Sequence, residues 1–165
     1  MRNTTPLYEK LVRYILDNQE RFYRLAYSYT KNQEDALDAV QNAVCKALES
    51  YRTLRNPDAI RTWFYRILIN ESCQLLKKQK KAQQLTETLL SDTVYHEQAY
   101  EPESDVFSKL EQLDQDVQLI LKLRYFEDMS LQEIAQVTGR NLNTVKSKLY
   151  RGLRQLKETM EEAVL

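Results

Sequence analysis

Residues 127–151 follow the pattern of a helix-turn-helix, and this limits the possible folds more than any other stretch of the chain. Ser130 and Glu133 have the spacing of a capping box, which begins a short helix. Gly139 stands where that helix has to end in a left-handed residue. Asn141 can then cap a second helix. Its inward face would consist of Val145, Leu149, Leu153 and Leu156.

The outer face of this second helix is basic. It carries Lys146, Lys148, Arg151, Arg154 and Lys157. From residue 140 to residue 157 the sequence contains no Asp or Glu. Helices that lie in a DNA groove have this charge pattern. DNA is therefore the first partner that the sequence indicates.

Glycine and proline are scarce, with two and three of 165 residues. Because sheets need more turn residues than this, we expect an all-α fold. The length suits one medium domain or two small ones. The sequence has neither an apolar run of about 18 residues, as a membrane span requires, nor an apolar signal-peptide core at its start. We therefore expect a cytoplasmic protein without direct membrane insertion.

The formal net charge of zero is the sum of unlike parts. Residues 1–82 carry 15 Lys and Arg against 9 Asp and Glu, whereas residues 83–112 carry one Lys against seven acids. Residues 113–165 are balanced, with their basic side chains gathered in the second helix of the helix-turn-helix. This asymmetry indicates two cationic binding surfaces joined by an acidic connector.

The helical periodicity predicts two small helical domains, residues 1–82 and 105–165, joined by a flexible acidic linker at 83–104. The series Asn56-Pro57-Asp58 is a strong helix start, and Trp63 is expected in the core of the helix that follows. The predicted helices cover residues 6–30 (as one helix or two), 33–50, 57–81, a short segment at 84–90, 105–112, 114–126 and the helix-turn-helix pair.

Cys45 and Cys73 fall on the apolar side of predicted helices, so we expect buried, reduced thiols. Two cysteines and the distant His96 do not have zinc-site spacing, and we assign neither a metal nor a cofactor. The sequence shows no catalytic constellation, such as a Gly-rich phosphate loop or a Ser/His/Asp arrangement. We therefore expect a protein that is not an enzyme.

Four segments resemble the extracytoplasmic-function (ECF) group of bacterial RNA polymerase sigma factors, and the likeness extends over about residues 19–82 and 105–157. Residues 22–27 (FYRLAY) are similar to the opening helix of that group's first domain, and residues 35–41 (DALDAVQ) to its core-polymerase-binding signature. Residues 63–70 (WFYRILIN) are similar to the helix that contacts the promoter −10 element, and residues 144–151 (TVKSKLYR) to the −35 recognition helix. Within the group, the sequence is most similar to the sigma-V-type proteins.

The resemblance implies an alternative sigma factor that binds the RNA polymerase core (β′ and β subunits), recognises −35 and −10 promoter elements and directs transcription initiation. Residues 1–82 would be its region 2 domain and residues 105–165 its region 4 domain. The resemblance also implies an anti-sigma factor, often membrane-anchored, that holds the protein inactive until a signal releases it.

The implied contacts fall into three sets. The surface that docks on the clamp helices of β′ would contain Asp35, Asp38, Gln41 and Asn42. The −10 set is Arg55, Asn56, Asp58, Arg66, Asn70, Lys77 and Lys78, of which the first three would cradle a flipped base. The −35 set is Thr144, Lys146, Ser147, Lys148, Tyr150, Arg151 and Arg154.

Within the −35 set, Lys146, Ser147 and Arg151 are the expected readers of base edges. The expected phosphate contacts are Thr144, Lys148 and Arg154. Tyr150 could touch a thymine methyl group or simply pack.

The chain departs from the family pattern at four positions. Asn42 stands where Glu is common, and Gln74 where Asp is common. Lys146 and Lys148 replace the usual arginines. Lysine keeps the positive charge but loses the two-pronged contact that arginine makes with guanine. We therefore expect Lys146 to read the −35 element less than arginine does in relatives.

Two other readings remain open at this point. In the first, the chain is a conventional regulator whose helix-turn-helix binds duplex DNA, usually as a dimer on a palindrome, while its N-terminal half senses a ligand or dimerises. In the second, it is a helical adaptor that binds only proteins, which leaves the acid-free basic stretch without a purpose. Nucleic-acid binding would exclude the adaptor.

Overall fold

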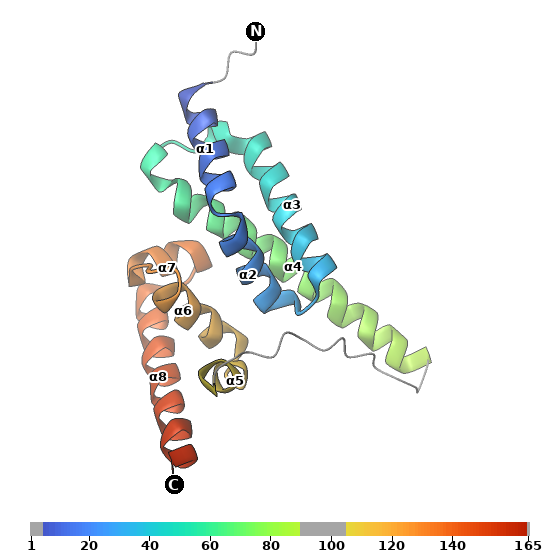
Figure 1. Cartoon of the computed structure of the whole chain (residues 1–165), viewed down its shortest axis with the longest axis vertical. Helices are drawn as coiled ribbons and strands as arrows, with labels where there is room; N and C mark the ends of the chain where they lie inside the picture. The colour runs from blue at the N-terminus through green and yellow to red at the C-terminus, as the bar shows by residue number, and fades with distance from the viewer. Residues whose placement is uncertain (1–4, 90–104, 165) are drawn as a thin grey trace. The chain divides into compact units, whose positions relative to one another are not determined.

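The computed structural model describes residues 5–89 and 105–164, and the chain forms two compact units, Met1–Ala99 and Tyr100–Leu165. Every regular element in these described ranges is a helix (Figure 1), which confirms the all-α expectation. None of the described helices is both long and apolar enough to cross a lipid bilayer.

The first unit consists of four α-helices and two short 3₁₀ turns in its described part. They are α1 (Pro6–Asp17), α2 (Gln19–Thr30), α3 (Gln33–Ser50), η1 (Tyr51–Thr53), η2 (Pro57–Ala59) and α4 (Ile60–Leu89). The segment predicted as one helix or two is a pair that breaks at Asn18. The Asn32 side chain caps α3 by accepting a hydrogen bond from the backbone N–H of Asp35 at 3.1 Å. The predicted start at Asn56 is also confirmed, because its Oδ1 accepts from the backbone N–H of Asp58 at 3.1 Å.

Helix α4 continues to Leu89, eight residues beyond its predicted end at Lys81. Residues 82–89 contain neither glycine nor proline, so nothing in the local sequence stops the helix there. The first residues of the predicted linker and most of the predicted short helix at 84–90 are therefore part of α4. Residues 90–104, which include His96, lie outside the described residues.

The core of the first unit forms where α3 and α4 pack against each other and against α2 (Figure 1). Phe22 from α2 and Phe64 from α4 are fully buried, with ring centroids 4.4 Å apart. Helix α3 contributes only small side chains to this core. Four alanines of α3 have no exposed surface: Ala36, Ala39, Ala43 and Ala47. Small residues let helices approach closely, so α3 lies directly against its neighbours.

Three burial expectations in this unit were wrong. Cys45 is exposed and Cys73 half-buried, whereas both thiols were expected to be buried. The buried side of α3 is the side that carries the four alanines. Cys45 lies on another side of the helix, one turn from the exposed Gln41. Trp63 is half-buried, since the neighbouring Phe64 occupies the core position.

The second unit consists of α5 (Asp105–Glu111), α6 (Gln115–Tyr125), α7 (Leu131–Thr138) and α8 (Leu142–Val164) in its described part. The capping box is present in full: the Glu133 N–H donates to Ser130 Oγ at 3.1 Å, and the Ser130 N–H donates to Glu133 Oε1 at 3.3 Å. Gly139 ends α7 in the left-handed conformation with φ +68°. Val145 and Leu149 are buried, whereas Leu153 and Leu156 are half-buried. The helix-turn-helix prediction is confirmed.

Candidate functional site

The exposed face of α8 brings together four side chains of the predicted −35 set. Ser147, Tyr150, Arg151 and Arg154 are exposed and follow each other at i, i+3, i+4 and i+7, which places them on one side of the helix. Tyr150 is 57% exposed. Of the two roles left open for it, the structure therefore does not support the one in which it simply packs. We call these four residues the α8 face.

The remaining members of the −35 set lie at the two edges of the α8 face. Lys146 is exposed. Thr144 and Lys148 are half-buried, because they adjoin the buried side of α8. Asn143, which the sequence analysis did not include, is exposed one turn before Ser147. Its four-residue spacing from Ser147 was the signal that could have identified it.

Asp116, in the first turn of α6, is held by two basic side chains. Its Oδ2 accepts hydrogen bonds from Arg140 Nη2 and from Lys148 Nζ, the latter at 3.1 Å. Partial burial by itself would raise the pKa of Asp116, but the hydrogen bond from Lys148 and the charges of Lys148 and Arg140 outweigh it and hold this pKa below its ordinary value. Asp114 makes a looser ion pair with Arg151, with Oδ2 and Nη2 3.7 Å apart.

The loop part of the predicted −10 set is exposed before α4. Arg55, Asn56 and Asp58 all face solvent there. Asn56 Oδ1 already accepts the capping hydrogen bond, and Asp58 forms an ion pair with Lys10 of α1 at 3.7 Å.

The helical part of the −10 set lines one side of α4. Arg66, Asn70 and Lys77 are exposed and separated by four and seven residues, close to one and two helical turns. Lys78 is exposed as well, about a third of a turn farther round. The structure thus places these side chains on a common polar surface of the first unit.

Three of the four predicted core-polymerase contacts are exposed on α3: Asp38, Gln41 and Asn42. Asp35 differs, because it is half-buried and its carboxylate accepts a hydrogen bond from Gln79 of α4. Its contact therefore joins α3 to α4 within the unit.

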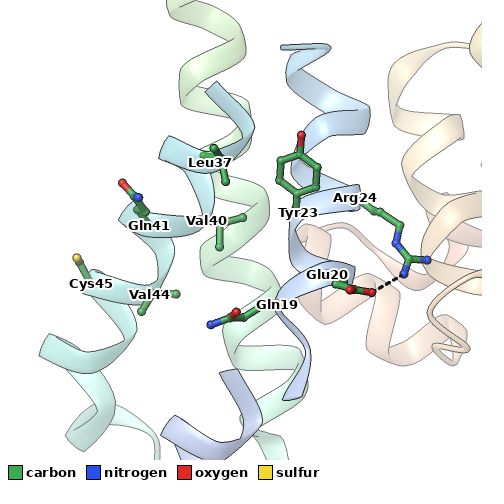
Figure 2. A pocket seen from close by; sticks show the side chains of 9 residues that line it. All are labelled: Gln19, Glu20, Tyr23, Arg24, Leu37, Val40, Gln41, Val44 and Cys45. Carbon is green, nitrogen blue, oxygen red and sulfur yellow. Dashed lines mark hydrogen bonds and ion pairs between the residues drawn. The ribbon is translucent and has the colours of Figure 1, made fainter. Parts of the chain in front are cut away.

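A groove of about 820 Å³ runs between α2 and α3, beside these exposed residues. Figure 2 shows Leu37, Val40 and Val44 of α3 lining it opposite Tyr23 of α2, with Gln41 at its edge. Leu37 is 51% exposed, which is unusual for a large apolar side chain. The alanines occupy the core side of α3, and its larger apolar residues Leu37, Val40 and Val44 line this groove instead. It was not expected from the sequence.

Both halves of the chain match sigma-factor family models. The model described as Sigma-70 region 2 matches residues 14–82, and that described as Sigma-70, region 4 matches residues 105–156. A conventional regulator would need a sensing or dimerising N-terminal half. The match over 14–82 therefore favours the sigma factor over that alternative.

Named relatives agree with these matches. The chain is 43% identical over 147 residues to the RNA polymerase sigma factor SigV of Bacillus subtilis, covering 89% of each chain. It is 25% identical over 159 residues to the ECF RNA polymerase sigma factor SigW of the same species, covering 87% of this chain and 85% of SigW.

A solved structure shares the fold: the sigma factor RpoE of Bartonella quintana, crystallised with the anti-sigma factor NepR. It has a TM-score of 0.73 and 20% sequence identity, with 90% of this chain and 95% of that chain covered. With both sigma regions matched and a relative that is 43% identical over 89% of each chain, the chain belongs to the extracytoplasmic-function group of bacterial RNA polymerase sigma factors.

Proposed function

We propose that this ECF sigma factor docks on core RNA polymerase through α3, reads the −35 element with the α8 face, and engages the −10 element with the loop before α4 and the polar side of α4. In this assignment residues 1–82 belong to the region 2 domain and residues 105–165 to the region 4 domain, and of the linker predicted at 83–104 the first seven residues are part of α4. The observation that carries the proposal is the α8 face, an exposed basic surface on the second helix of a helix-turn-helix.

Core binding is assigned to the exposed side of α3 together with the groove beside it. Asp38, Gln41 and Asn42 supply polar contacts, and Leu37, Val40 and Val44 supply apolar surface that a helix could cover. Apolar surface rimmed by polar residues is typical of protein interfaces. The β′ clamp helices are the occupant that the family resemblance implies.

Charge reversal tests the core-binding surface. Asp38→Arg should weaken binding to purified core polymerase without lowering the thermal stability of the chain, because Asp38 is exposed. Asp17→Arg, an exposed acid at the end of α1, is the matched control and should bind core as the parent does. Equal core affinity for Asp38→Arg and the parent chain would remove Asp38 from the interface.

The −35 assignment gives Arg151 the largest role in base recognition, because it is the only arginine among the three expected readers of base edges. A bidentate arginine contact with guanine is worth about 1–3 kcal/mol of discrimination, so Arg151→Ala should lower the preference for the correct −35 sequence by that amount. If Arg151 instead holds a phosphate, binding to all sequences should fall alike.

The −10 assignment rests on the exposed loop and the polar side of α4. Extruding a base costs a few kcal/mol, which stacking and hydrogen bonds to the flipped base offset. Asn70→Ala should therefore impair promoter opening more than binding to closed duplex. Potassium permanganate footprinting of the melted strand measures that difference.

Run-off transcription with purified core polymerase on a promoter library tests the function as a whole. Transcripts that need both this chain and particular −35 and −10 sequences would support the proposal. Core binding without any promoter-dependent transcript, over a library that covers both elements, would contradict it. On this assignment the polymerase performs the chemistry and the chain itself is not an enzyme.

An anti-sigma factor is part of the proposal. The structurally similar RpoE was crystallised with one, and the family resemblance implies one here, often membrane-anchored. The chain would act in the cytoplasm, where its polymerase and promoters are.

A further inference from the structure

The helix-turn-helix contains more positive charge than it presents to solvent. Arg140 and Lys148 both donate to the same oxygen of Asp116. The side chain of Lys148 is 22% exposed and that of Arg140 is 36% exposed. Two cations next to the α8 face are therefore already paired with a carboxylate of the same unit.

The pairing of Arg151 is of another kind. Its guanidinium lies 3.7 Å from Asp114, and the two side chains are 53% and 84% exposed. Ion pairs between such exposed groups contribute little, so Arg151 can leave Asp114 for DNA at small cost. Lys148 would have to leave a partly buried hydrogen bond that also involves Arg140.

The position of Asp116 gives its contacts a mechanical consequence. Arg140 belongs to the turn between α7 and α8, Lys148 belongs to α8, and Asp116 belongs to α6. One carboxylate thus ties the turn and the recognition helix to a third helix. These contacts restrain the direction in which the α8 face points and hold the two cations beside that face.

We propose that Asp116 is a positioning residue of the DNA-binding surface, which holds Lys148 and Arg140 off the phosphate backbone so that α8 meets DNA through its exposed face. This inference rests on the proposed function of the α8 face. It gives Lys148 an internal partner in place of the phosphate contact expected from the sequence. Asp116 itself touches no DNA.

Keeping Lys148 and Arg140 away from the phosphates changes the balance between affinity for DNA of any sequence and discrimination between sequences. Phosphate contacts strengthen binding to every sequence, whereas base contacts strengthen binding to one. Asp116→Asn should therefore tighten binding to non-promoter duplex and reduce the ratio of promoter to non-promoter affinity. It should also make binding more sensitive to salt.

Salt dependence of binding measures these contacts directly. Binding of the full-length chain to a labelled duplex of random sequence is titrated at a series of salt concentrations. Each phosphate contact contributes about 0.9 to the slope of log K against log salt. Arg154→Ala, which removes an exposed cation of the α8 face, should reduce the slope by about 0.9, whereas Lys148→Ala should change it by less than about 0.3. Asp116→Asn should steepen it by about 0.9 to 1.8.

The double variant distinguishes a positioning role of Asp116 from a general loss of packing in the second unit. If Asp116 withholds Lys148, then Lys148→Ala should reduce the slope by about 0.9 in the Asp116→Asn background, although it has little effect in the parent chain. Asp116→Glu keeps the carboxylate and should restore the parent slope. Circular dichroism of each variant checks that its helix content equals that of the parent chain.

Two results would overturn the inference alone. One is a Lys148→Ala loss as large as that of Arg154→Ala in the parent chain, which would place Lys148 on a phosphate. The other is a folded Asp116→Asn variant with an unchanged slope. A parent chain whose DNA binding ignores salt, or an Arg154→Ala variant that binds as the parent does, would overturn the proposed function of the α8 face as well.

Discussion

Gly152 lies where α8 crosses α6, and replacing it with alanine sets two effects against each other. A Cβ at this position would lie 2.5 Å from Val117 Cγ1 and 3.1 Å from Leu121 Cδ1. Carbon atoms in ordinary contact are about 3.5–4.0 Å apart, so the nearer contact is a clash. Gly152→Ala therefore tests how tightly α8 is packed on α6.

The magnitude follows from the two opposing terms. Alanine is favoured over glycine inside a helix by about 1 kcal/mol. Extra methyl groups in a filled core cost about 1–3 kcal/mol, and the upper half of that range applies because Val117 and Leu121 are 1% and 3% exposed and Val117 is β-branched. We expect Gly152→Ala to destabilise the second unit by about 1–2 kcal/mol net, which for a unit this small is a fall of about 4–16 °C in Tm.

Thermal unfolding of the full chain, followed by two probes, measures this effect. Trp63, the single tryptophan, belongs to the first unit, so its fluorescence reports that unit. Circular dichroism at 222 nm reports the helices of both units. Gly152→Ala should lower the transition of the second unit and leave the fluorescence transition in place.

A compensating variant distinguishes a clash with Val117 from a general loss of stability. Val117→Ala removes the methyl group that the new Cβ would meet at 2.5 Å and leaves only the longer contact with Leu121, so adding Gly152→Ala in that background should stabilise the second unit. A rise in Tm for Gly152→Ala alone would contradict this close approach of α6 and α8.

Three further perturbations have expected outcomes. Ser130→Ala removes the cap of α7 and should destabilise the second unit by about 1 kcal/mol in urea unfolding, whereas Ser147→Ala, in mid-helix, should have an effect several-fold smaller. Phe64→Ala empties the centre of the first unit and should cost about 3–5 kcal/mol, seen as an early loss of the Trp63 fluorescence transition. Because the folded-state pKa of Asp116 is below its unfolded value, its stabilising effect should be complete above the unfolded pKa of about 4 and disappear as the pH falls through the lowered value. The stability difference between the parent chain and Asp116→Asn should therefore shrink between pH 7 and pH 2, and a difference that is the same at both would contradict the pairing.

The local sequence alone determined the helices and their ends in most of the chain. Ser130, Glu133 and Gly139 act through backbone groups within a few residues, so their spacing was sufficient to place α7 and the turn after it. Asn56 and Pro57 likewise placed the start of the helical segment that becomes α4. The C-terminal end of α4 was harder, since no glycine or proline marks it.

Where more than one side of a helix is apolar, the tertiary structure determines which side faces the neighbouring helices. On α3 the alanines are buried and Leu37 is exposed, because the close approach of α2 and α4 leaves no room for larger side chains. This packing exposes Cys45 and creates the groove beside Gln41. Hydrophobic periodicity ranks residues by size and polarity, and it carries no information on the distance between helices.

The same division applies to the candidate DNA-binding surface. The acid-free stretch of α8 was visible in the sequence, and it identified the helix that presents the basic side chains. That Lys148 and Arg140 are held by Asp116 was not visible, because the partners are 32 and 24 residues apart and meet only when α6 packs against α8. Sequence determined the charges of α8, and the packing of α6 against α8 determined which of them are unpaired, because a carboxylate neutralises the cations that the fold places beside it.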